Sequence, residues 1–151
     1  MHASSPATAD TVDLGPPHEP KEESINVFNE IQHELKKHLV HIRHEHNKHE
    51  KEYFAAVEHL SDAELAGFGA NDFSEVRVAF TAYGIILFGK VRIPAMPEEG
   101  PAYIHFRAFT TGPDDKAKLH SIHTEEKEHE GGDRTYRAIF SVSDPLEWFD
   151  T

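Results

Sequence analysis

The sequence predicts an α+β fold, in which a long N-terminal helix packs on a curved antiparallel sheet of four to five strands. Apolar residues recur every three or four positions over the first third of the chain, as on one face of a helix. From residue 75 onward they alternate at every second position, as in strands. No helical pattern separates the predicted strands, which excludes βαβ units. The 151-residue length predicts a single domain over residues 21–151, after a Pro-rich flexible tail over residues 1–20.

The predicted helix begins near residue 22 with an apolar stripe of five residues: Phe28, Ile31, Leu35, Leu39 and Ile42. The same spacing then passes through His46 and His49 and resumes over residues 53–60. Either one helix runs from about residue 22 to about residue 60, or two helices meet near residues 44–49. If the stripe is buried there, protonation of His46 and His49 is unfavourable and the joint is sensitive to pH.

Residues 75–93 are the most apolar part of the predicted sheet. Val76, Val78 and Phe80 place the inward positions on even numbers, whereas Val91 and Ile93 place them on odd numbers. This reversal falls within residues 84–89, where four large apolar residues follow one another. The segment is either an exposed hairpin bend or a strand that is buried on both faces. We adopt the exposed bend as the working prediction.

The remaining strands are predicted over residues 102–109, 117–124 and 134–142, with the first two joined by a turn over residues 111–114. Residues 125–132 are mostly charged and are predicted to form a loop. Leu146, Trp148 and Phe149 follow Pro145 and are expected to fold back over an apolar surface.

Composition restricts the choice of partners. Twenty-seven acidic residues against fifteen basic ones give a formal charge of −12, which argues against nucleic acid and anionic membranes. The chain has no cysteine, no visible secretory signal and no stretch long enough to cross a bilayer, so we expect a soluble cytoplasmic protein. Protonation of all thirteen histidines would bring the charge near +1 and lower the solubility.

The histidines and aromatic residues offer weaker signals of chemistry. Histidines stand three residues apart at positions 38, 41 and 44, at 46 and 49, and at 120 and 123, a spacing that allows two imidazoles to share a metal. No His-x-x-x-His pair occurs, so we predict no specific metal site and no cofactor. Five side chains could line the concave face of a curved sheet: Tyr83, Tyr103, His105, Arg107 and Tyr136. No catalytic motif accompanies them, and we predict that the protein is not an enzyme.

Two segments resemble a known family. Residues 103–109, followed by Gly112 and Pro113, resemble the third strand and second hairpin of the stefins, the intracellular, disulfide-free cystatins, and residues 29–37 look like the stefin helix. Counting back without a gap places Gly89 on the glycine that closes the family's first inhibitory hairpin. The chain departs from the family in four ways: it lacks the Gln of the Gln-x-Val-x-Gly hairpin, has Phe88 where the family has a small residue, inserts residues 38–71, and extends over residues 134–151.

The resemblance implies a cystatin-like fold and reversible inhibition of papain-like cysteine proteases. In that mechanism an N-terminal segment and two hairpins form a wedge that fills the protease cleft without offering a cleavable bond. The residues that it implies for protease binding are Gly15, Ile85, Ile86, Leu87, Phe88, Gly89, Thr111, Gly112 and Pro113. Two alternatives remain open: a non-inhibitory interaction or self-assembly protein that uses the sheet edge or the long helix, and a His-rich binder that responds to metal or pH.

Overall fold

A computed structural model describes residues 13–112 and 115–150. The chain forms an α+β fold, as predicted. Its elements are α1 (Glu22–His49), η1 (Lys51–Val57), α2 (Asp62–Leu65), η2 (Ala70–Asp72), β1 (Phe73–Thr81), β2 (Gly84–Arg92), β3 (Tyr103–Thr110), β4 (Lys118–Ile122), β5 (Glu125–Glu128) and β6 (Arg134–Arg137). Over the described part of the chain, no helix has both the length and the apolarity that a membrane span requires.

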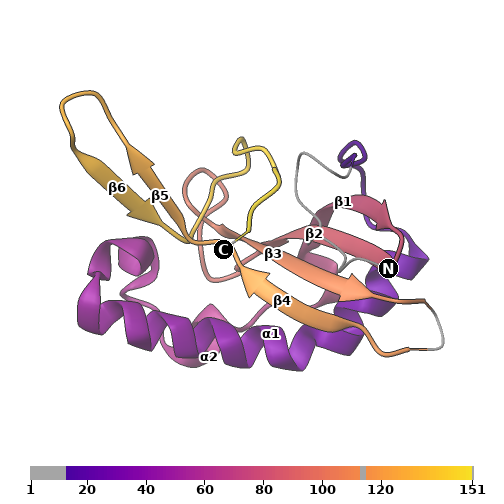
Figure 1. The fold of residues 1–151 in the computed structure, drawn as a ribbon. Coiled ribbons are helices and arrows are strands. Elements are labelled where there is room, and N and C mark those ends of the chain that lie inside the picture. Colours follow the sequence, from indigo (N-terminus) through magenta and orange to yellow (C-terminus); the bar gives the residue numbers. More distant parts are fainter. Residues whose placement is uncertain (1–12, 113–114, 151) are drawn as a thin grey trace.

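The strands form one antiparallel sheet with the order β1-β2-β3-β4 and a separate β5-β6 hairpin. Figure 1 shows α1 along one side of the sheet and the C-terminal segment, residues 141–150, over the other side. We call these two faces the helix side and the tail side. The β5-β6 hairpin projects away from the sheet (Figure 1).

The helix side contains the larger core. Phe28, Ile31, Leu35 and Leu39 of α1 are buried, which confirms the predicted stripe. The ring of Phe28 lies 5.1 Å from that of Phe73 and 6.1 Å from that of Phe106, measured between centroids. The apolar side chains that the helical period places on one face therefore meet apolar residues from two strands.

α1 ends at His49 and η1 turns back, so two helices meet near the predicted break. Arg43, which interrupts the apolar pattern, is buried and donates hydrogen bonds to the main-chain oxygens of Val57 (3.2 Å) and Leu60 (2.8 Å). It thereby satisfies carbonyl groups of the returning chain. His46 is half-buried, and its burial lowers its pKa. His49 is exposed, so neither histidine of the proposed joint is fully buried.

The change of inward parity comes from the β1-β2 turn. Val78 pairs with Leu87 and Phe80 pairs with Ile85, so even positions of β1 share a face with odd positions of β2. The prediction of an exposed bend over residues 84–89 is therefore wrong, because the turn lies earlier, between Thr81 and Gly84.

β2 is buried on both faces. Leu87 and Val91 belong to the core on the helix side, whereas Ile86 and Phe88 belong to a second cluster on the tail side. Trp148 and Phe149 lie over Phe88, each with its ring centroid 5.1 Å away. This arrangement confirms that the C-terminal aromatic residues cover an apolar surface.

Residues 125–132 differ from the predicted loop, because Glu125–Glu128 form β5 and pair with β6. Opposite charges face each other across this hairpin: Arg134 pairs with Glu126 at 2.9 Å and Arg137 with Glu125 at 2.8 Å. A run of charged residues can therefore form a solvated strand when the partner strand has complementary charges. The last predicted strand is also shorter than expected, since β6 ends at Arg137.

Candidate functional site: a docking edge at one end of the sheet

Three segments meet at one end of the main sheet, and we call this region the docking edge. It consists of residues 13–18, the β1-β2 turn over residues 81–84, and residues 110–112 after β3. The two turns are neighbours because Ile85 at the start of β2 pairs with Thr110 at the end of β3.

Residues 13–18 lie along the outer edge of β1. The main-chain nitrogen of Gly15 donates to the oxygen of Val78 (2.8 Å), and His18 exchanges two hydrogen bonds with Val76 (2.9 and 3.0 Å). Arg77 also donates from Nε to the oxygen of Gly15 (2.7 Å). This part of the predicted tail is thus held against the sheet, whereas residues 1–12 lie outside the described residues.

The β1-β2 turn is held by the hydroxyl group of Thr81. Its Oγ1 accepts hydrogen bonds from the nitrogens of Tyr83 and Gly84 (both 3.1 Å) and donates to the oxygen of Gly84 (2.9 Å). Gly84 has a φ of +154°, and a Cβ there would lie 2.5 Å from the oxygen of Thr110. Glycine is therefore required where the two turns approach each other.

Two large apolar side chains are exposed at this turn. Phe80 is 75% exposed and Tyr83 is 63% exposed, whereas the other phenylalanines of the sheet are buried or half-buried. Exposed aromatic residues on a rigid turn are typical of surfaces that bind a partner, because little conformational entropy is lost on binding.

A cavity of about 490 Å³ lies between this turn and the N-terminus of α1. Its apolar wall comes from both layers of the fold and consists of Val27, Val78, Phe80, Ile85 and Leu87. Gly15, Pro16 and His18 line another part of the cavity, so the N-terminal segment forms part of the same concave surface.

The docking edge contains only some of the residues that the stefin resemblance implied. Gly15, Thr111 and Gly112 lie in it and Ile85 lines its cavity, but Pro113 falls outside the described residues. Three other implied residues, Ile86, Leu87 and Phe88, are buried in the sheet, and of these only Leu87 lines the cavity.

Gly89 also differs from its implied role of closing a hairpin. It lies in the middle of β2, where an added Cβ would come within 2.2 Å of the Phe106 ring. Counting back from the β3 resemblance without a gap therefore placed the first hairpin several residues too late in the sequence. Phe80 and Tyr83 were missed as docking residues for the same reason, although Gly84 was a usable turn signal.

The histidines do not assemble into a metal site in the described residues, which contain no group of three or more His, Cys, Asp or Glu side chains able to hold an ion. His38, His41 and His120 line an open cavity of about 390 Å³ beside α1 and β4. The pKa of His38 is lowered by its partial burial and then by neighbouring His41.

Comparison of the chain with models of known protein families, with curated proteins and with solved structures gave no match.

Proposed function

We propose that this protein is a non-catalytic, reversible inhibitor of papain-like cysteine proteases that binds through the docking edge. The observation that carries the proposal is the meeting of the N-terminal segment and both turns at one end of the sheet. The stefin resemblance implies a wedge made from these same three segments. A cytoplasmic location, without nucleic acid or membrane partners, is part of the proposal.

The wedge uses other side chains than the resemblance implied. Phe80 and Tyr83 supply its exposed apolar surface in place of Ile86, Leu87 and Phe88. Gly15 and Gly112 flank them, and neither carries a side chain that would keep main chain away from a protease cleft. Interfaces of this kind depend mostly on a few large aromatic residues.

The test is a titration of papain with the full chain, using hydrolysis of a small fluorogenic peptide as the readout. We expect reversible inhibition by the wild type. The double variant with Phe80→Ala and Tyr83→Ala should inhibit at least about tenfold more weakly, because each truncation removes an aromatic contact. Val142→Ala is the matched control, because Val142 is 64% exposed but lies in the C-terminal segment.

Inhibition that survives the double substitution would show that the docking edge is not the binding surface. No inhibition at micromolar protein would rule out the inhibitor proposal altogether.

Self-assembly is the second candidate, and β4 is the observation that favours it. In the sheet order β4 stands at one edge, and no strand among the described residues pairs with its outer side. An unpaired strand edge is a template for pairing with another copy. Sedimentation of the full chain tests this candidate, since a monomer at high micromolar concentration would contradict it.

A further inference from the structure

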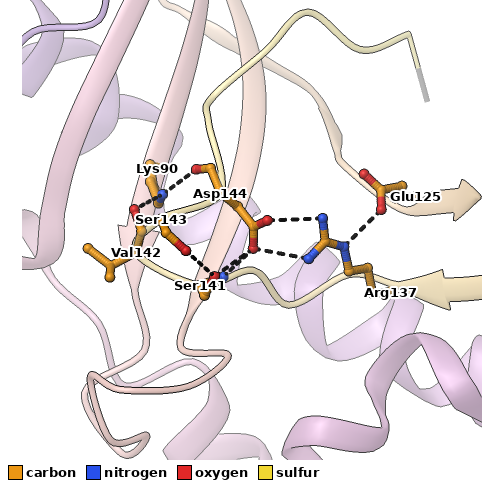
Figure 2. A network of polar contacts seen from close by, with 7 residues as sticks. All are labelled: Lys90, Glu125, Arg137, Ser141, Val142, Ser143 and Asp144. Atoms are coloured by element: carbon orange, nitrogen blue, oxygen red, sulfur yellow. Dashed lines mark hydrogen bonds and ion pairs between the residues drawn. The ribbon is translucent and has the colours of Figure 1, made fainter.

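The tail side of the sheet carries charged residues that hold the C-terminal segment. Lys90 is buried and donates from Nζ to the main-chain oxygens of Val142 (3.0 Å) and Asp144 (2.7 Å). Figure 2 shows these contacts beside the fork of Arg137 on the Asp144 carboxylate, at 3.0 and 3.1 Å. The first part of the C-terminal segment is thus fixed by hydrogen bonds to β2 and β6.

The second part of the segment is held by Arg77, by Arg107 and by apolar contacts. Arg77 donates from Nη1 to the oxygen of Leu146 (2.9 Å), and Arg107 donates from Nη1 to the oxygen of Phe149 (3.1 Å). The guanidinium of Arg107 also lies 4.9 Å from the Trp148 ring centroid. Residues 145–150 therefore lie on a face that is both aromatic and positively charged.

Two histidines form part of a continuous ring stack under this segment. His105 stacks on Phe140 at 4.3 Å, Phe140 on His123 at 5.2 Å, and His123 on Phe149 at 4.4 Å, with interplanar angles of 10°, 3° and 16°. The stack joins His105 in β3 and His123, just after β4, to two phenylalanines near the C-terminus. A positive charge on His123 would lie against the ring of Phe149, and one on His105 would lie against the ring of Phe140.

Both histidines are neutral in the folded protein. Burial and, to a smaller extent, the nearby cation Lys90 lower the pKa of His105 to about 3. Burial likewise lowers the pKa of His123 to about 4. His105 is only 2% exposed, and its Nε2 has no hydrogen-bond partner within the described residues.

Among the described residues, few groups near His105 can neutralise an added proton. The charged and titratable groups that act on His105 come from β2, from the end of β4, from β6 and from the C-terminal segment: Lys90, His123, Arg137 and Asp144. His123 faces Glu125 and Arg137, and three further charged residues line the cavity shared by both imidazoles: Lys127, Asp144 and Glu147. Asp144 and Glu125 share the single cation Arg137, and Lys90 offsets the one negative charge that remains. A positive charge on buried His105 beside Lys90 would therefore be poorly compensated.

We propose that residues 145–150 are an acid-released cover: protonation of His105 and His123 lifts them from the sheet and exposes Phe88, while the helix side stays folded. Release lets water solvate the new imidazolium charges, which the closed form excludes. The core on the helix side is mainly apolar. His46 packs on Tyr53 and Phe54 beside it but is only half-buried, so acid acts on this side less strongly.

Trp148 provides the readout, because it is the only tryptophan in the chain and it packs on Phe88 in the closed form. We expect its emission to move to longer wavelength between about pH 6.5 and pH 4, the range between the ordinary histidine pKa and the lowered values. Far-UV circular dichroism of α1 should stay constant over the same range. A change in emission that occurs only together with loss of helical signal would overturn the proposal.

Variants assign the transition to the ring stack. The double variant with His105→Phe and His123→Phe keeps planar rings but cannot be protonated, so its emission midpoint should fall by at least about one pH unit. His49→Phe is the matched control, because His49 is exposed on α1, and it should titrate as the wild type does. An unchanged midpoint in the double variant would overturn the proposal.

A second measurement uses the unaltered chain in case the double variant does not fold. The ring carbon-proton signal of His105 in NMR spectra should titrate with the same midpoint as the Trp148 emission, because release and protonation are one step. Titration of His105 with no accompanying change at Trp148 would contradict the proposed release.

Discussion

The two faces of the main sheet are covered in different ways. On the helix side, apolar residues of α1 meet apolar residues of β1, β2 and β3, and the ring of Phe28 lies at the centre. On the tail side, a ten-residue segment without regular structure is held by buried Lys90 and Arg107 as well as by aromatic rings. The helix side is stabilised by packing, whereas the tail side is stabilised by packing, by hydrogen bonds and by two imidazoles that stay neutral. The free energy of unfolding should therefore depend on the volume of buried side chains on the helix side and on the protonation of the two histidines on the tail side.

The largest effect is expected from Phe28→Ala on the helix side. Removal of a fully buried ring leaves a cavity between α1 and two strands and should cost about 3–5 kcal/mol of unfolding free energy. Urea unfolding followed by circular dichroism measures this change. Phe80→Ala is the matched control, since Phe80 is exposed, and it should change the free energy by less than about 0.5 kcal/mol.

Acid should destabilise the tail side through His105. The unfolded chain binds the His105 proton near pH 6.5, but the folded chain binds it only near pH 3, so this contribution to stability is complete above pH 6.5 and falls below it. At pH 4.5 the loss from this residue should be about 3 kcal/mol. Urea unfolding at several pH values measures it, and the stability of His105→Phe should fall less steeply. Equal slopes for the two proteins would contradict the burial of a neutral imidazole.

Lys90→Met should have a smaller effect, again on the tail side. The substitution keeps most of the side-chain length but removes the donor for the oxygens of Val142 and Asp144. We expect a loss of about 1–3 kcal/mol of unfolding free energy. It should appear as a lower urea midpoint in the Trp148 emission. Lys118→Met, at an exposed position of β4, is the control and should leave the transition nearly unchanged.

The same contrast explains what could be predicted from the sequence. The helix side follows from periodicity, because Phe28, Ile31, Leu35 and Leu39 repeat with the helical spacing and α1 was predicted from them. The tail side contains polar residues that alternate along their strands as solvent-facing residues do: Lys90, His105 and Arg107. The sequence pattern therefore does not indicate that they are buried. Their burial depends on residues 141–150, which lie far away in the sequence.

The docking edge was predicted only in part, because the β1-β2 turn was placed wrongly in the sequence. The N-terminal segment and the second turn were expected at one end of the sheet together with a first hairpin, and the described parts of all three do meet there. The first hairpin was misplaced because Thr81–Gly84 lacks the Asn-Gly or Asp-Gly pair that marks most two-residue turns. Phe80 continues the alternation of Val76 and Val78 and was therefore taken to face inward, although it is 75% exposed beside the cavity at the N-terminus of α1.

The docking edge is tested most directly by mapping main-chain amide signals in NMR spectra of the labelled protein while papain, blocked at its catalytic cysteine, is added. The proposed function predicts changes confined to residues 13–18, 80–85 and 110–112, with the signals of residues 141–150 unaffected. Changes centred on β4 or on the C-terminal segment, or no change at saturating protease, would contradict it.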